Sequence, residues 1–251
     1  MLQVSHLNKS YTNSAGTYPV LKDVSFHIKK GEFVAVMGPS GSGKTTLLNC
    51  ISCFIPHDSG SIRLGDQDLS GLNEAQMARI RNEKLGFVFQ DFMLLDGLSV
   101  RENICLPQII AGRPIAQMEA NAENLCQLFG ISGIMDKYPA EISGGEKQRT
   151  AVARSLMNHP YIILADEPTG NLDSRSCKAV ITAFLQAKAQ VHATIFMVTH
   201  DSYAASFCDR VIVLKDGKIW TQAQRSGSQR QFMDDLLNIL RSLGGDDSDN
   251  A

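Results

Sequence analysis

Residues 38–45, GPSGSGKT, carry the strongest chemical signal in the sequence. They fit the pattern G-x-x-x-x-G-K-[ST], in which glycines let the backbone curl closely around phosphate oxygens. Lys44 is expected to bind β- and γ-phosphates, and the hydroxyl of Thr45 to bind Mg²⁺. The loop follows an apolar run, 33–37, and precedes a helical stretch, 46–49, whose N-terminus adds partial positive charge. This arrangement predicts binding of a nucleoside triphosphate.

Two adjacent carboxylates, Asp166 and Glu167, follow a second apolar run, 161–165. Sheets of the α/β class place their ligands at the carboxyl ends of the strands. Asp166 is expected to hold Mg²⁺ from its outer coordination sphere. Glu167, on the other face of the extended chain, is expected to polarise the attacking water as general base. A solvated turn is the alternative, because DEPTGN contains turn-favouring proline and glycine, but the loop at 38–45 favours the catalytic interpretation.

A third motif, SGGEKQR at 143–149, stands before a helical run that reaches Met157. Ser143 and Glu146 have the S-x-x-E spacing of a capping box, so a helix cap alone would explain them. The two glycines would also expose backbone N–H groups at a helix N-terminus, where phosphate binds well. The two interpretations are compatible.

Alternating β-rich and helical runs predict a parallel sheet flanked by helices, which would position these motifs. Continuous apolar runs are typical of central strands covered on both faces; they occur at 33–37, 161–165 and 194–198. Further strands are predicted at 2–7, 24–28, 85–89 and 210–214, with a tight turn at 215–218.

The remaining chain is predicted to be mainly helical. Between Gln90 and His159 apolar residues recur at helical spacing, which predicts a helical insertion between two strands. The tail has an apolar helix face made of Phe232, Leu236, Leu240 and Leu243. This face is expected to pack either on its own domain or on a partner. Residues 244–251 are small and acidic, and are predicted to be disordered.

The composition excludes several classes of protein. The chain has 251 residues, of which 43% are hydrophobic and 20% charged, as in globular domains rather than disordered or collagen-like chains. A formal net charge of −2 argues against binding nucleic acid through bulk charge. No apolar run reaches the roughly 18 residues of a membrane helix, and the N-terminus lacks a secretory pattern. The sequence therefore predicts a cytosolic chain.

Six cysteines lie in apolar surroundings, and Cys50 and Cys53 form the one close pair. They are interpreted either as a metal or redox pair or as two small core residues of a helix, and the second reading is preferred. Because no second pair of cysteines or histidines stands at zinc spacing, no metal–thiolate site is expected.

The motifs together resemble those of the ATP-binding-cassette (ABC) ATPases. ISGGEKQR resembles the signature motif of that family, GPSGSGKTT its Walker A motif and IILADEP its Walker B motif. Further landmarks occur in the order of the family: Gln90 in VFQD, Asp173 in NLD and His200 in VTHD. Tyr11 lies upstream of the loop, where the family carries an adenine-stacking aromatic residue. The resemblance covers roughly residues 2 to 220.

This resemblance implies an α/β fold, a P-loop NTPase of the ABC cassette type. Such a cassette has a RecA-like core sheet, an antiparallel β subdomain and a helical insertion. It places the ATPase domain at 1–220, with the helical subdomain at about 91–159. Residues 221–251 remain as a C-terminal extension with a short amphipathic helix and an acidic tail.

The resemblance also implies ATP hydrolysis in a head-to-tail sandwich dimer of two copies, with ATP and Mg²⁺ as ligands. One copy would supply Tyr11, Gly38, Pro39, Ser40, Gly41, Ser42, Gly43, Lys44, Thr45, Thr46, Gln90, Asp166, Glu167 and His200. The other would supply Ser143, Gly145 and Glu146, with Asp173 closing the interface. The implied catalytic residues are Glu167, His200 and Lys44, and the implied Mg²⁺ residues are Thr45, Gln90 and Asp166.

One position departs from the family pattern, since residue 146 is Glu where Gln is commonest. A carboxylate near phosphate is electrostatically unfavourable, although Glu146 keeps the capping role and Lys147 offsets part of its charge. We interpret this as tuning rather than inactivation. Tyr11 also has an alternative interpretation, as a plain surface aromatic residue.

Three longer segments, around 86–104, 198–220 and 221–245, resemble the ATPases of bacitracin-type antimicrobial peptide exporters, within the lipoprotein-release and macrolide-export group. The resemblance implies a separate integral membrane permease, often linked to a sensor histidine kinase. A cytosolic coupling helix of the permease would dock in a groove formed by residues 90–106 of this chain. The chain would then lie peripherally on the inner face of the cell membrane and power peptide export or resistance. The alternative is a lipoprotein-releasing, macrolide-export or cell-division complex.

Other classes of ABC protein fit the sequence less well. Members that act on ribosomes or DNA carry two linked cassettes or long coiled coils, which this sequence lacks, so no nucleic-acid partner is expected. A non-hydrolysing scaffold would be expected to lack Glu167 or His200, and both are present.

Overall fold

The computed structural model describes residues 1–14 and 16–245, which form two compact units. Unit 1 comprises 1–29, 33–70 and residues from 197 onward, and unit 2 comprises 30–32 and 71–196. The chain passes from unit 2 to unit 1 within strand β8 (Ile195–Val198). Each unit therefore contains segments that are far apart in the sequence.

Unit 1 contains a four-stranded antiparallel sheet in the order β2-β1-β4-β5. Its strands are β1 (Leu2–Asn13), β2 (Gly16–Ile28), β4 (Ser59–Leu64) and β5 (Gln67–Asp68). The strands predicted at 2–7 and 24–28 are confirmed, and both extend into a longer hairpin. One face is buried because apolar residues such as Leu2 and Val4 alternate with exposed ones.

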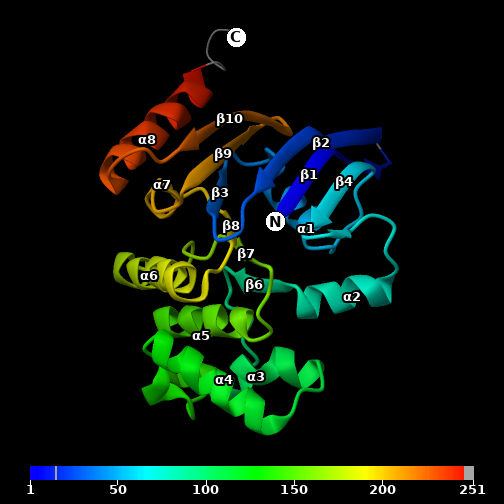
Figure 1. Cartoon of the computed structure of the whole chain (residues 1–251). Coiled ribbons are helices and arrows are strands. Elements are labelled where there is room, and N and C mark those ends of the chain that lie inside the picture. The colour runs from blue at the N-terminus through cyan, green and yellow to red at the C-terminus, as the bar shows by residue number, and fades with distance from the viewer. Residues whose placement is uncertain (15, 246–251) are drawn as a thin grey trace. The chain divides into compact units, whose positions relative to one another are not determined.

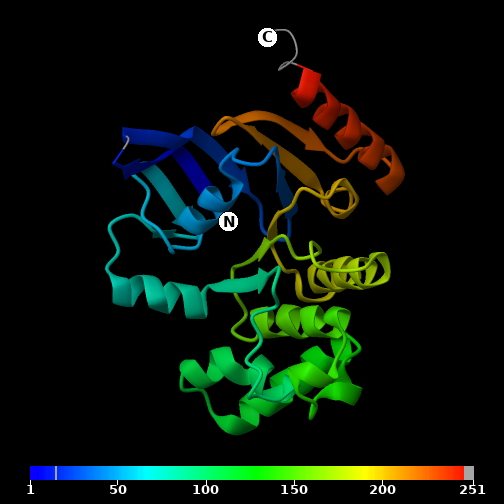
Figure 2. The same cartoon turned by 180° about the vertical axis from the view of Figure 1, so that it is seen from behind.

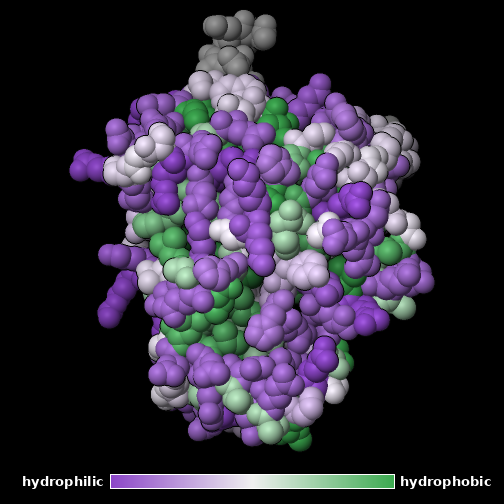
Figure 3. Space-filling model, in the orientation of Figure 1, coloured by the Kyte–Doolittle hydropathy of each residue, from purple (hydrophilic) through white to green (hydrophobic). Residues whose placement is uncertain are grey.

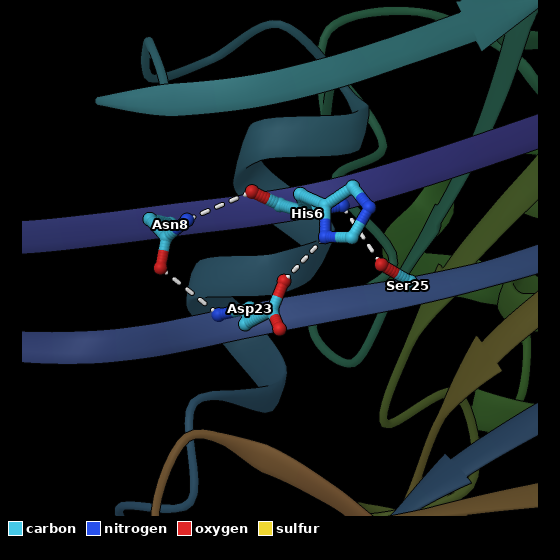
Figure 4. A network of polar contacts seen from close by, with 4 residues as sticks. All are labelled: His6, Asn8, Asp23 and Ser25. Carbon is cyan, nitrogen blue, oxygen red and sulfur yellow. Dashed lines mark hydrogen bonds and ion pairs between the residues drawn. The ribbon is translucent and has the colours of Figure 1, made fainter.

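A bulge interrupts the β1–β2 pair, and Figure 4 shows the polar contacts of the residues around it. His6 and Asp23 both adopt a left-handed backbone, with φ of 52° and 58°, and the strand register shifts there. Side chains take over backbone hydrogen bonds: the His6 N–H donates to Ser25 Oγ at 2.8 Å, and the Asp23 N–H donates to Asn8 Oδ1 at 2.9 Å. Asn8 Nδ2 also donates to the carbonyl of His6 at 2.8 Å. This network of hydrogen bonds stabilises the bulged part of the β1–β2 hairpin, whose strand β1 also carries Tyr11.

The second strand group of unit 1 leads into the phosphate-loop segment. Strand β3 (Phe33–Met37) is buried throughout and runs parallel to β9 (Arg210–Lys215), which pairs antiparallel with β10 (Lys218–Gln224). Six residues separate the end of β3 from the start of helix α1 (Lys44–Ile51). The strands predicted at 33–37 and 210–214 are confirmed, and β10 continues past residue 220 to pair Gln224 with Arg210.

The tail forms helix α8 (Gln229–Gly245), which packs on unit 1 beside α7 (Ser202–Ala205) (Figures 1 and 2). Phe232, Leu236 and Leu243 are buried, and Gln229 Nε2 donates to Ser206 Oγ at 2.5 Å. The predicted helix face therefore packs on its own domain. Most of the predicted acidic tail, 246–251, lies outside the described residues.

Unit 2 is mainly helical around two parallel strands, β6 (Leu85–Phe89) and β7 (Ile162–Asp166). Its helices are α2 (Glu74–Glu83), α3 (Val100–Ile110), α4 (Ile115–Leu128), α5 (Gly144–Leu156) and α6 (Ser174–Val191). Figure 1 shows α5 between α6 and the α3–α4 pair, and α5 also packs on β6. The predicted helical insertion between two strands is confirmed.

Several helices of unit 2 begin at side-chain caps that are visible in the sequence. Ser99 with Glu102 and Ser143 with Glu146 form matching capping boxes at the starts of α3 and α5. Such caps satisfy N–H groups that have no partner within the helix, so they fix where each helix starts.

The face drawn in Figure 3 is mainly hydrophilic, with smaller hydrophobic patches. Among residues 1–14 and 16–245, no helix is both long and apolar enough to span a bilayer.

Candidate functional site

The phosphate-loop segment in unit 1 bends tightly between β3 and α1. Gly38 has φ of 147°, and a Cβ there would lie 2.2 Å from the carbonyl oxygen of Leu214 on β9, so only glycine fits. Gly43 precedes α1 with φ of 100° and offers no side-chain cap. The first turn of α1 therefore keeps backbone N–H groups available for a ligand.

Two polar side chains occupy this loop. Lys44 Nζ donates to the carbonyl oxygens of Gly38 and Pro39, each at 2.9 Å, so the ammonium lies over the loop. The Ser42 hydroxyl is buried and has no hydrogen-bond partner among the described residues. A cation and an unsatisfied buried hydroxyl at a helix N-terminus form a donor set suited to phosphate oxygens.

Unit 1 also contains Tyr11 and His200. Tyr11 lies opposite Tyr18 on the β1–β2 hairpin and is 45% exposed, with Lys9 Nζ 5.7 Å from its ring centre. This exposure agrees with either interpretation of Tyr11, as a stacking or a plain surface residue. His200 is exposed between β8 and α7, directly before Asp201, whose carboxylate caps α7.

In unit 2, the carboxyl ends of β6 and β7 bring Gln90 close to the acidic pair. Phe89 is paired with Asp166, so Gln90 and Glu167 each follow a paired residue of neighbouring parallel strands. Glu167 has a left-handed backbone with φ of 45°. Such a conformation is unfavourable for a non-glycine residue by about 1–3 kcal/mol and is often found at functional sites.

The segment after Glu167 holds Gln90 by its side chain. Gln90 Nε2 donates to Asn171 Oδ1 at 2.9 Å, and Asn171 Nδ2 donates to Asp91 Oδ1 at 2.8 Å. Asn171 was noted in the sequence only as a neighbour of Asp173, because no local pattern shows that it contacts residues about 80 positions earlier. The Nε2 end of Gln90 is thus engaged by Asn171, and Oε1 is the end of this amide that can bind a cation.

The signature turn starts α5 with its own capping box. Glu146 Oε2 accepts from the backbone N–H of Ser143 at 2.8 Å and from its hydroxyl at 2.7 Å. Ser143 Oγ in turn accepts from the N–H of Glu146 at 3.3 Å. The hydrogen bond from the Ser143 side chain is the main reason that the pKa of Glu146 lies below its usual value. Residue 146 therefore remains a carboxylate that is used as a cap.

The signature turn also lies against the start of α6. A Cβ on Gly145 would lie 3.1 Å from Ser176 Oγ, which itself donates to Asp173 Oδ2 at 2.8 Å. Asp173 also accepts from the N–H groups of Arg175 and Ser176 and caps α6, and these bonds lower its pKa. Within one chain, Asp173 is thus a helix cap, a role that the sequence interpretation did not include.

Two further residues of α5 contact the same region. Gln148, fully buried, donates from Nε2 to the carbonyl oxygens of Phe89 at 3.1 Å and Pro168 at 2.8 Å. Arg154 donates to the carbonyl oxygens of Phe92, at 2.8 Å, and Met93, and burial lowers its pKa to about 10. Their contacts join segments far apart in the sequence, so spacing alone did not reveal them.

Unit 2 has an open pocket of about 290 Å³ next to these contacts. It is bounded by α2, β6, α3 and α5, and its lining includes Arg81, Phe87, Met93, Leu106, Ile110 and Arg154. Met93 and Ile110 are both more than half exposed. The pocket therefore combines exposed apolar side chains with polar groups at its rim.

Comparison with known proteins identifies the family. The sequence pattern of the ABC transporter family matches residues 21–170. The ABC transporter ATP-binding protein YxdL of Bacillus subtilis is 44% identical over 99% of this chain and 96% of its own. The bacitracin export ATP-binding protein BceA of Halalkalibacterium halodurans is 43% identical over 100% and 99%. The macrolide export ATP-binding/permease protein MacB of Mannheimia succiniciproducens is 42% identical over 90% of this chain but 35% of its own length.

A solved structure gives the same result. The dimeric, post-hydrolysis structure of the ATP-binding cassette MJ0796 bound to ADP and Pi aligns with a TM-score of 0.81 at 34% identity, covering 91% of this chain and all of that one. This likeness confirms the expected α/β fold of an ABC cassette. On its sequence motifs, its relatives and its fold, this chain belongs to the ABC transporter family and is an ATPase of the ATP-binding-cassette type.

Proposed function

We propose that the phosphate loop and the Gln90–Glu167 region act together on one ATP. Lys44 and the amides of the loop bind the β- and γ-phosphates, Tyr11 stacks on the adenine, and His200 contacts the γ-phosphate. Glu167 takes the proton of the attacking water as general base. The position of Glu167 directly after β7 supports its role, and the Lys44 ammonium, which donates to two carbonyl oxygens of the loop, supports phosphate binding there.

The donor set also suits Mg²⁺, which prefers oxygen ligands. Thr45 and Gln90 would bind the ion, with Asp166 holding it from the outer sphere. The Gln90 amide fits this role because Asn171 engages its Nε2 end and leaves Oε1 for the ion. When bound, Mg²⁺ would neutralise charge on the transferring phosphate.

A second copy of the chain completes the site in this proposal. Ser143, Gly145 and Glu146 of one copy would face the γ-phosphate bound by the other, with Asp173 at the interface. The MJ0796 cassette is dimeric in its post-hydrolysis structure with ADP and Pi, which supports the participation of two copies. ATP would stabilise the closed dimer, and hydrolysis would release it, because the ligand contacts both copies only in the closed state.

We infer that the ATPase powers a separate membrane permease and that the transporter exports, or confers resistance to, a bacitracin-type antimicrobial peptide. The observation that carries this inference is the match to BceA, which extends over the whole of this chain, α8 included. The chain would then act at the inner face of the cell membrane. A sensor histidine kinase reached through the permease remains part of this proposal.

The pocket of unit 2 is the proposed docking site for a cytosolic helix of the permease. Exposed Met93 and Ile110 offer apolar contacts of the kind that an amphipathic helix fills. Arg154 connects this pocket to the carbonyls of Phe92 and Met93, close to Gln90. Docking of a helix at the pocket would therefore affect the segment that contains Gln90, Phe92 and Met93.

Capture of the partner tests the proposed function. A tagged Glu167→Gln variant should bind ATP, fail to hydrolyse it and accumulate as closed dimer, so it can be extracted with its partner from native membranes. Lys44→Ala, which lacks the phosphate contact, serves as the matched control. A permease with a large extracellular domain, at one copy per two ATPases and absent from the control, would support the peptide-resistance proposal.

Other results would change the assignment. The similarity to MacB favours macrolide export as the second candidate, together with lipoprotein release and cell division. A permease of one of these systems would transfer the function to that candidate. Capture of ribosomes, or of no membrane protein, would contradict the transporter proposal. Hydrolysis by Glu167→Gln at the wild-type rate would show that another residue is the base.

A further inference from the structure

Gln148 is buried at the point where three segments of the unit 2 site meet. Its exposed fraction is 0%, and its Nε2 group donates two hydrogen bonds to backbone carbonyls. One acceptor is Phe89, the residue directly before Gln90, and the other is Pro168, the residue directly after Glu167. One amide thus holds the chain next to both residues that are proposed to act on ATP.

The unsatisfied half of the same amide strengthens this argument. Gln148 Oε1 is buried and has no hydrogen-bond partner among residues 1–14 and 16–245. Leaving a buried acceptor unpaired is unfavourable by about 1–3 kcal/mol, and an apolar side chain of the same length would avoid that loss. The presence of a glutamine at this buried position is therefore better explained by the two carbonyl groups that its amide binds than by packing.

The place of Gln148 on α5 gives these bonds a further effect. Gln148 lies two residues after Glu146, so the helix that carries the signature turn also holds the ends of β6 and β7. A helix moves as a rigid element over so few residues. A displacement of the signature turn would therefore reach the backbone beside Gln90 and Glu167 through these two hydrogen bonds.

We propose that Gln148 is a positioning residue, which fixes Gln90 and Glu167 relative to each other and to the signature turn through its bonds to Phe89 and Pro168. This inference rests on the proposed roles of Gln90 and Glu167 in ATP hydrolysis. Because its two hydrogen bonds lie directly beside Gln90 and Glu167, we expect Gln148 to affect the rate of the chemical step much more than the affinity for nucleotide.

Substitution of Gln148, with Gln108 as matched control, tests the proposal. Gln108 on α3 is also buried, also leaves Oε1 unpaired among the described residues, and donates from Nε2 to the carbonyl of Met157 at 2.6 Å, at the other end of α5. Gln148→Met should lower kcat for ATP by about tenfold or more, with the Kd for a fluorescent ATP analogue changed by less than about twofold. Gln108→Met should leave kcat within about twofold of wild type.

Gln148→Glu gives a readout that a purely structural role would not produce. The protonated carboxyl can donate one of the two hydrogen bonds, whereas the carboxylate would repel both carbonyls. Burial raises the pKa of the introduced carboxyl, so kcat should recover at acid pH and fall as pH rises through this raised pKa. Gln108→Glu should show no such dependence of kcat on pH.

Each outcome decides the question. Wild-type kcat in Gln148→Met, equal losses in the Gln148 and Gln108 variants, or a parallel change in nucleotide Kd would overturn the proposal. Failure of both Gln148 variants to fold, while Gln108→Met folds, would make Gln148 a folding residue and would also overturn it. Glu167→Gln in the same assay separates the two levels of inference: if that variant is active, the proposed roles fail, and if it is inactive while the Gln148 variants are normal, only the positioning role fails.

Discussion

The two glycine-containing helix starts, at 38–45 in unit 1 and 143–146 in unit 2, satisfy their backbone groups differently. Gly43 precedes α1 without any side-chain cap, and Lys44 lies over the loop. By contrast, α5 has a complete capping box in which Ser143 and Glu146 bond to each other's backbone. The first turn is therefore open to a ligand, whereas the second is stable without one. A phosphate at the second turn must share the Ser143 hydroxyl with Glu146.

The largest effect is expected for the lysine of the open turn. Lys44→Ala removes an ammonium that contacts this loop and should lower ATP hydrolysis by about a hundredfold or more, measured as phosphate release by the full-length chain. Lys147→Ala, in the capped turn, is the matched control and should change the rate by less than about threefold. Normal turnover by Lys44→Ala would remove the loop from the active site.

Steric requirements at the glycines of the open turn should appear as losses of stability. Gly38→Ala combines φ of 147° with a Cβ 2.2 Å from the Leu214 carbonyl and should destabilise unit 1 by about 3 kcal/mol. Gly41→Ala, with φ of 79° but no atom within 4 Å, should lose about 1 kcal/mol. Urea unfolding monitored by the single tryptophan, Trp220 on β10, measures both. Equal losses of stability in the two variants would show that the close contact with the Leu214 carbonyl does not determine the cost of Gly38→Ala.

The capped turn can be compared with an equivalent cap elsewhere in unit 2. Ser143→Ala and Ser99→Ala each remove the serine of a capping box and should each lower the free energy of unfolding by about 1 kcal/mol. ATP-dependent dimer formation, measured by light scattering in a Glu167→Gln background, should weaken only for Ser143→Ala. If Ser99→Ala weakens the dimer equally, the signature turn acts through stability and not through phosphate.

The smallest effect concerns the charge of Glu146. Its pKa is lowered by bonds from Ser143, so the stabilisation that it provides is present above the unfolded pKa, near 4.5, and is lost as pH falls through the lower folded value. Glu146→Gln keeps an acceptor for the cap and should lose less stability than wild type as the pH falls below 4.5.

The glutamate of the other box provides the control for this charge. Hydrogen bonds from Ser99 also lower the pKa of Glu102, so Glu102→Gln should reduce acid sensitivity in the same direction. Glu146→Gln alone should strengthen the ATP dimer, by about two- to fivefold, because it removes a negative charge beside phosphate. An unchanged dimer affinity would mean that the carboxylate and the phosphate do not face each other.

Local patterns predicted the elements that carry the chemistry. The apolar run 33–37 became β3, the run 161–165 became β7 apart from one residue at each end, and the S-x-x-E spacing became the cap of α5. Contacts between distant segments were not predictable, because spacing does not report them. The hydrogen bond from Gln148 to Phe89 spans 59 residues and depends on how α5 packs on β6.

Backbone conformation and strand length show the same limit. Histidine and aspartate adopt a left-handed backbone more often than most non-glycine residues. The types of His6 and Asp23 still do not show that a bulge forms there, because the bulge arises from the register of two paired strands. The polar composition after residue 220 predicted that a C-terminal extension starts there. In the structure, strand β10 continues to Gln224. An edge strand such as β10 tolerates polar residues, so composition did not reveal where it ends.

All six cysteines are buried, so the rate at which a thiol reagent modifies them can report how often the native chain opens locally. Only a thiolate is alkylated readily, and burial raises the pKa of both Cys50 in α1 and Cys126 in α4 to about 12. Alkylation should therefore await local unfolding, and mass spectrometry of the modified peptides would report each unit separately. Running that experiment with and without ATP would show which unit the nucleotide makes more rigid, without introducing any label into the protein.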